Sequence, residues 1–236
     1  MELQLMKQTW FPLLVGALLL AGQSARAAVV ISEVLFNEVG SDATGEWIEI
    51  YNNGAATVDL SAWKIGDEET SGGTGTSEGM FQFPPGAMIA AGEVQIVAVD
   101  ADTFNANYGF LPAYEVTGAN AGVPNLTVYS AWDNDGDKIN MSNSNDQAVL
   151  LDGADAIADA VSWGGTFAFD PALDASAESD GQSWERINAT IDTDTAADWQ
   201  LGNPSSPGVV SIVPEPAAAA LAVLAAAGCL AAGRRS

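Results

Sequence analysis

The sequence at 133–137, Asp-Asn-Asp-Gly-Asp, has the residue types and spacing that could most readily bind a metal ion. Asp133, Asp135 and Asp137 place carboxylate oxygens at every second residue around a glycine, as calcium-binding loops do. An EF-hand loop also has its glycine at position six and a glutamate at position twelve, whereas Gly136 is fourth here and Ser144 is twelfth. We therefore interpret this loop either as a calcium site, with calcium as the only candidate cofactor, or as a solvated acidic turn.

Other residues have a chemical and a structural interpretation. The acidic stretches at 67–69 and 170–180 could add metal ligands, but solvated loops are the simpler prediction. Trp132 and Trp163 could stack on sugar rings, although core packing is more typical of a small β protein. Arg186, the only arginine between residues 28 and 213, has many carboxylates around it and is expected to form a structural ion pair.

The residue counts exclude several kinds of catalysis. The chain has no histidine, and its single cysteine, Cys229, lies in a C-terminal apolar run. Nucleophilic pairs that depend on histidine are therefore excluded, and carboxylates remain as the main acid–base candidates. Nothing marks out one pair among the 31 acidic residues. We expect a protein that is not an enzyme, with a carboxylate- or metal-dependent hydrolase of polysaccharide as an alternative.

The charge is strongly negative, with 31 acidic and 7 basic residues and a formal net charge of −24 at pH 7. Between residues 28 and 213 the only cations are Lys64, Lys138 and Arg186. Such a surface repels phosphate backbones, so nucleic acid is excluded as a partner. It attracts divalent cations instead.

The N-terminal residues 1–27 have the pattern of a signal peptide. Lys7 supplies a positive charge, 10–21 is apolar, and 25–27 is the small-x-small sequence Ala-Arg-Ala. The apolar run is shorter than the ~20 residues that a membrane-spanning helix needs. We predict cleavage after Ala27 and export of the chain that follows.

A second targeting pattern lies in the C-terminal residues 209–236. Pro214, Glu215 and Pro216 precede an apolar run at 217–233, which is followed by Arg234 and Arg235. This run is long enough to predict a transmembrane helix, with the two arginines on the cytoplasmic side. The order closely resembles the PEP-CTERM sorting signal of Gram-negative bacteria, which an exosortase recognises and cleaves near Pro-Glu-Pro. A permanent tail anchor is the alternative.

The residues between these signals predict an all-β protein. In 46–54, Ile48 and Ile50 point to one side, whereas Trp47, Glu49 and Tyr51 point to the other. We expect a hairpin with 58–65 that has one face in a core and one part-polar face. A capped helical turn is expected at 102–109, with Asp102 as N-cap and Gly109 as stop, and a linker at 202–208. The other expected strands are 29–36, 80–83, 94–99, 139–141, 148–152, 156–163 and 184–187.

Several motifs within 28–208 resemble the lamin tail domain. They are Ile-Ser-Glu-Val at 31–34, Glu-Trp-Ile-Glu-Ile-Tyr-Asn at 46–52, Val-Asp-Leu-Ser-Ala-Trp-Lys-Ile at 58–65, Asp-Ala-Val-Ser-Trp at 159–163 and Ser-Trp-Glu-Arg-Ile at 183–187. The resemblance implies an immunoglobulin-like antiparallel β-sandwich that binds or scaffolds and has no general catalytic residues.

Together these patterns predict a protein exported to the envelope or extracellular matrix, anchored in the membrane by its C-terminal helix before processing. The expected partners are an exosortase and exopolysaccharide.

Overall fold

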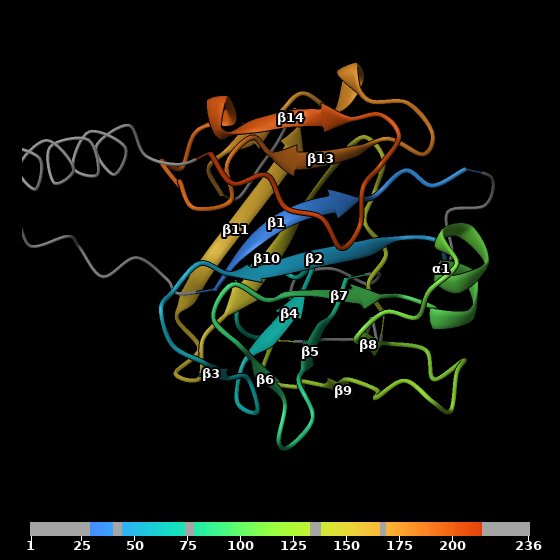
Figure 1. Cartoon of the computed structure of the whole chain (residues 1–236), viewed down its shortest axis with the longest axis vertical. Helices are drawn as coiled ribbons and strands as arrows, with labels where there is room; N and C mark the ends of the chain where they lie inside the picture. Colours follow the sequence, from blue (N-terminus) through green and yellow to red (C-terminus); the bar gives the residue numbers. More distant parts are fainter. Residues whose placement is uncertain (1–28, 40–43, 74–77, 133–137, 166–168, 214–236) are drawn as a thin grey trace, which may run out of the picture.

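The computed structural model describes residues 29–39, 44–73, 78–132, 138–165 and 169–213 (Figure 1). The predicted signal peptide at 1–27, the loop at 133–137 and the sorting signal from Pro214 onwards lie outside these ranges and stay predictions. Within the described ranges, no helix has the length and apolarity needed to cross a membrane.

The regular secondary structure of the described chain is mostly β-strand, as predicted. Its elements are β1 (Val29–Leu35), β2 (Trp47–Asn52), β3 (Val58–Asp59), β4 (Lys64–Gly66), β5 (Met80–Gln82), β6 (Met88–Ile89), β7 (Val94–Ala98), α1 (Ala101–Tyr108), β8 (Tyr114–Glu115), β9 (Thr127–Val128), β10 (Asn145–Leu151), β11 (Ile157–Gly164), β12 (Ala172–Leu173), η1 (Ala175–Ala177), β13 (Ser183–Arg186), η2 (Ala196–Asp198) and β14 (Trp199–Gly202).

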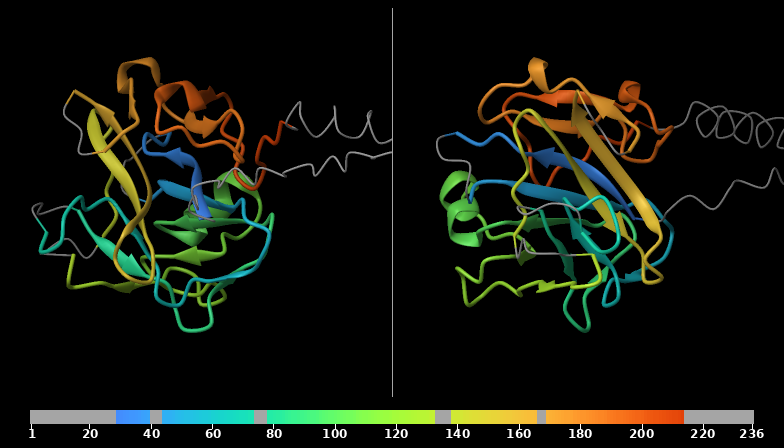
Figure 2. Two further views of the ribbon diagram at one scale, coloured as in Figure 1. Left: turned by 90° about the vertical axis from the view of Figure 1, so that its left-hand side faces the viewer. Right: turned by 180° about the vertical axis from the view of Figure 1, so that it is seen from behind.

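The strands form two six-stranded sheets and a small pair, β3–β6. The first sheet has the order β14-β13-β1-β2-β7-β8, and the second has the order β12-β11-β10-β4-β5-β9. Seen from behind, β10 and β11 lie in front of β1 and β2, so that the two sheets are stacked (Figure 2). Most pairings are antiparallel, whereas β7–β8 and β11–β12 are parallel. The main core lies between the sheets and includes Ile48, Ile50, Leu150 and Val161.

The central strand β2 alternates as predicted, but neither of its faces is open to solvent. Ile48 and Ile50 belong to the core between the sheets. On the other face, Trp47 packs against Phe104 of α1, and Glu49 is fully buried. The expected part-polar face is therefore corrected: a helix and a later segment of the chain cover it.

The predicted hairpin between 46–54 and 58–65 is wrong. Strand β2 pairs with β1 and β7, whereas β3 pairs with β6 and β4 belongs to the second sheet. The chain crosses from one sheet to the other because Leu60 and Ile65 are both fully buried in the core between them. The apolar alternation predicts the buried faces correctly, but it does not reveal which strand is the neighbour.

The predictions for the helix caps, for the strand at 139–141 and for the two tryptophans are confirmed in part. Gly109 ends α1 in the left-handed conformation, as expected, but the N-cap is Asp100, whose carboxylate accepts the Thr103 N–H. The predicted strand at 139–141 is not a strand in the structure. Trp163 is fully buried in the main core and Trp132 is buried against the second sheet, which confirms the packing interpretation for both.

Candidate functional site

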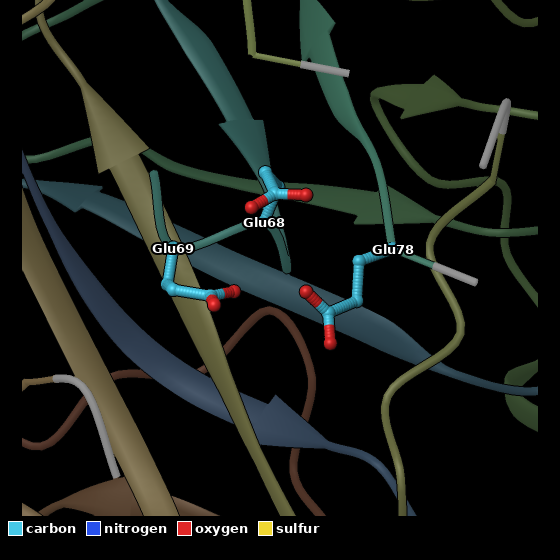
Figure 3. Close-up of side chains that lie close together, drawn as sticks. All are labelled: Glu68, Glu69 and Glu78. Atoms are coloured by element: carbon cyan, nitrogen blue, oxygen red, sulfur yellow. The ribbon is translucent and has the colours of Figure 1, made fainter. Parts of the chain in front are cut away.

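Three glutamates meet at the base of the β4–β5 hairpin. Glu68 and Glu69 follow β4, and Glu78 is separated from β5 by Gly79 alone. The two strands are held in register by the pairing of Gly66 with Met80. One carboxylate oxygen from each glutamate lies within 4.8 Å of the other two. Figure 3 shows Glu69 and Glu78 pointing toward each other, with Glu68 beside them.

Asp67 fixes the chain on both sides of this group. Its N–H donates to the Gly79 carbonyl at 3.0 Å, and its Oδ1 accepts the Gly79 N–H at 2.7 Å. Its other oxygen, Oδ2, accepts the N–H of Asn140 at 2.7 Å. A fully buried carboxylate therefore ties together the two ends of the hairpin loop and the segment that follows residues 133–137.

The environment of Glu78 opposes its ionisation. Glu68 is fully buried, and Glu69 and Glu78 are partly buried. Burial raises the pKa of Glu78 to about 8, and Glu69 raises it further through a hydrogen bond and its negative charge. Glu78 Oε2 is buried and has no hydrogen-bond partner in the described part of the chain. The group thus concentrates negative charge in a place where water solvates it poorly.

The spacing of the glutamate oxygens is compatible with one divalent cation. Two oxygens that each lie about 2.4 Å from one calcium ion are separated by at most about 4.8 Å. Three carboxylates can supply up to about six oxygens, which is the lower end of the coordination number of calcium. Glu68, Glu69 and Glu78 are therefore the residues that could hold a metal ion among those described.

A second group of buried carboxylates holds the neighbouring segment. The N–H of Met141 donates to Oε2 of Glu46 at 2.9 Å, and the N–H of Ser142 donates to Oδ2 of Asp146 at 2.6 Å. With Asp67 on Asn140, three successive amides donate to three different acidic residues. Glu46 and the segment 140–144 line a polar cleft of about 450 Å³.

Burial perturbs this second group strongly. It raises the pKa of Glu46 to about 9 and that of Asp146 to about 6, and it raises the pKa of Asp67 well above its ordinary value. The negative charges of Glu38, Asp67 and Asp146 add to the effect at Glu46. This end of the sandwich therefore holds protons near neutral pH, unless a cation replaces them.

Of the acidic residues that the sequence indicates as candidate ligands, the structure buries some and leaves others exposed. It buries Asp67 and Glu68, so the solvated interpretation of 67–69 is wrong for both. In 170–180, by contrast, Asp174 and Asp180 are exposed, as expected. Glu78 was missed, because it stands alone at the far end of a low-complexity loop. Asp133, Asp135 and Asp137 lie outside the described residues, as do Pro214, Glu215, Pro216, Arg234 and Arg235.

Comparisons with known proteins identify the fold. The family model for the lamin tail domain matches residues 22–165. Among solved structures, the chain is similar to a DUF4876 family protein from Bacteroides thetaiotaomicron VPI-5482, with a TM-score of 0.53, 13% identity and coverage of 81% of this chain and 73% of that one. At this identity the likeness supports the fold alone. No curated protein sequence matches the chain.

Proposed function

Because this chain belongs to the lamin tail domain family, we propose that it is a non-enzymatic binding protein exported to the envelope or extracellular matrix of a Gram-negative bacterium. Its role is adhesion or association with exopolysaccharide. The observation that carries the proposal is the order of segments along the chain. A signal-like segment precedes the β-sandwich, and the Pro-Glu-Pro motif of the PEP-CTERM-like segment at 209–236 directly follows Val213, the last described residue, which contacts the sandwich.

In this proposal the two ends of the chain act in sequence. The segment 1–27 directs export and is removed, and the apolar run 217–233 then holds the protein in the membrane. Arg234 and Arg235 stay on the cytoplasmic side. An exosortase recognises the Pro-Glu-Pro motif at 214–216 and releases the domain from the membrane.

The test is the intact mass of the protein recovered from the envelope and the medium of a host with an exosortase. We expect a chain that begins at Ala28 and lacks the residues beyond the 214–216 motif. Replacement of Pro214, Glu215 and Pro216 by alanine should preserve the C-terminal segment. The charge-preserving variant R234K/R235K serves as the matched control and should be processed normally. An unprocessed C-terminus in the wild-type chain would instead indicate a permanent tail anchor.

A second candidate function is a calcium-dependent binding module. It is favoured by Glu68, Glu69 and Glu78, each of which has one carboxylate oxygen within 4.8 Å of the other two. Calcium would neutralise their charge and connect the two ends of the hairpin loop between β4 and β5. The residues on both sides of 133–137 are attached nearby, because Trp132 packs in one cluster with Met80 and Asn140 bonds to Asp67. The three glutamates and the residues that flank the 133–137 loop therefore lie in the same part of the sandwich.

A further inference from the structure

The segment 203–213, which we call the strap, crosses the outer face of the first sheet. Figure 1 shows it in orange-red, passing from β14 in front of β1 toward β2. Near its start, Ser205 Oγ lies 3.0 Å from the hydroxyl oxygen of Tyr108 on α1. Toward its end, the Ala189 N–H donates to the Ser211 carbonyl at 2.9 Å, and Asn188 Nδ2 donates to the Val213 carbonyl at 3.2 Å. The predicted linker at 202–208 is thus a docked segment.

The sequence of the strap produces the turn that lets it dock. The N–H of Val209 donates to the Ser206 carbonyl at 3.2 Å, with Pro207 and Gly208 at the two central positions. Gly208 has a φ of 87°, which suits glycine at the third position of a type II turn. Beyond the turn, Val210 packs against the apolar cluster that contains Tyr51.

Three glutamates from adjacent strands lie beneath this turn. Glu33 on β1 is paired in register with Glu185 on β13 and with Glu49 on β2. The N–H of Ser206 donates to Glu33 Oε1 at 2.9 Å, and Ser206 Oγ donates to Glu185 Oε2 at 2.9 Å. The N–H of Gly208 donates to Glu49 Oε2 at 2.6 Å. Three of the hydrogen bonds that attach the strap to the sandwich are therefore made to carboxylates.

Two of these glutamates, Glu33 and Glu49, are buried without a compensating cation among the described residues. Glu33 is 1% exposed and Glu49 is 0% exposed, and neither forms an ion pair in the described part of the chain. Glu33 Oε2 is buried with no hydrogen-bond partner there. An ionised carboxylate in such a place is costly, since like charges on adjacent strands also repel. The charged groups that act on Glu49 are Glu33 and Glu185, and Glu185 acts on Glu33.

From this geometry we propose that the strap is a pH-sensitive latch, docked while Glu33 and Glu49 carry protons and loosened when both are ionised. Burial raises the pKa of Glu33 to about 7 and that of Glu49 to about 8. The N–H groups of Ser206 and Gly208 lower these two pKa values in part, but burial is the larger cause. An undocked strap would remove both effects and return the two groups toward their ordinary values. Docking is thus favoured in acid and weakens as the pH rises through 7 to 8.

The latch sets the length of free chain between the sandwich and the sorting motif. When the strap is docked, the motif at 214–216 begins one residue after Val213, whose carbonyl is held by Asn188. When it is released, eleven more residues, 203–213, separate the motif from β14. This consequence for processing rests on the proposed function, whereas docking itself does not. A processing enzyme would reach the motif more easily at the higher pH.

The test is hydrogen exchange of the full chain in detergent micelles, read by mass spectrometry on peptides that cover the strap. At pH 8.5 we expect strap exchange at least about tenfold faster than at pH 5.5, after correction for the chemical rate, because each unit of pKa difference changes the docking equilibrium about tenfold. In E33Q/E49Q the side chains are neutral but still accept hydrogen bonds, so protection of the strap should no longer depend on pH.

Two further variants make the test decisive. Glu178 has a pKa that burial raises to about 7, but its side chain bonds to Asn37 and not to the strap, so E178Q should keep the wild-type response. Ser206→Pro removes the N–H donor to Glu33 and the hydroxyl donor to Glu185, and it should leave the strap unprotected at both pH values, while β1 and β2 stay protected. If E33Q/E49Q fails to fold, this variant still tests whether protection of the strap depends on its docking. Equal wild-type protection at both pH values, or a pH response that survives in E33Q/E49Q, would overturn the latch. Intact-mass analysis reports on processing separately.

Discussion

Arg186 on β13 and Asp159 on β11 form an ion pair that joins the two sheets, with Nη2 2.9 Å from Oδ2. Both side chains are at least 98% buried, at 1% and 2% exposure. The same Asp159 oxygen accepts the Ile31 N–H at 2.7 Å, and Arg186 Nε donates to the Ile31 carbonyl at 2.7 Å. Arg186 also pairs with Asp192 and lies 4.8 Å from the ring of Trp199. The structural role predicted for this arginine is confirmed.

Removing the arginine alone should be strongly destabilising. Arg186→Met leaves the buried Asp159 without its cation, and we expect the free energy of unfolding to fall by about 3–5 kcal/mol. The double variant R186M/D159L removes both charges and should recover much of this loss. Urea unfolding followed by tryptophan fluorescence measures both. If the single variant is as stable as wild type, the ion pair does not join the sheets in the way described.

Stability should fall as the pH rises from mildly acidic to alkaline. Burial raises the pKa of Glu46 to about 9, that of Glu49 to about 8 and that of Glu33 to about 7. Each group binds its proton more tightly when folded, so the unfolded state binds fewer protons between the ordinary value of 4.5 and the raised one. The urea midpoint without calcium should therefore decrease between pH 5 and pH 9. Glu46→Gln should flatten this decrease, and a midpoint that rises with pH would contradict the prediction.

Calcium should stabilise the chain through Glu78 if the second candidate function is correct. A ligand at about 100 times its dissociation constant adds about 2.7 kcal/mol to the free energy of unfolding, so millimolar calcium should raise the melting temperature relative to EDTA. Glu78→Gln should reduce the shift strongly, whereas Asp174→Asn, at an exposed carboxylate, should not. A full shift in Glu78→Gln that is lost in Asp135→Asn would assign the ion to the 133–137 loop instead.

Gly66 should not tolerate a side chain. A Cβ at this position would lie 2.0 Å from the Gly79 carbonyl oxygen, which is backbone and cannot turn away. Gly66→Ala should therefore separate β4 from β5 and lower the free energy of unfolding by about 1–3 kcal/mol, as overpacking does. Gly165→Ala is the matched control, because a Cβ there meets nothing within 4 Å. Equal effects of the two substitutions on the urea midpoint would refute the steric explanation.

The sequence predicts the strands and their inward faces well, because alternation is a local property. Ile48 and Ile50 could be assigned to the core without knowledge of their neighbours. The burial of Glu49 could not, since it depends on the strap, which is about 160 residues away in the chain. The wrong hairpin has the same origin, because alternation states which face is apolar but not which strand lies beside it.

The candidate site was harder to predict than the fold. Glu69 and Glu78 meet because β4 and β5 pair, and nothing in the intervening low-complexity sequence indicates that pairing. The acidic residues at 67–69 suggested solvation by composition, yet Asp67 and Glu68 are fully buried. Because the chain has few cations, a buried carboxylate such as that of Asp67 accepts hydrogen bonds from backbone N–H groups instead. No side-chain motif in the sequence reveals these hydrogen bonds.

The measurement that tests the central claim most directly is incubation of the purified protein with exopolysaccharide of a matrix-forming Gram-negative host. Protein that sediments with the polysaccharide and the size distribution of the polysaccharide are followed in the same samples. The account predicts that the protein co-sediments and that the polysaccharide keeps its length. Shortening of the polysaccharide would show an enzyme, and a protein that stays in the supernatant with or without calcium would contradict a role in exopolysaccharide association.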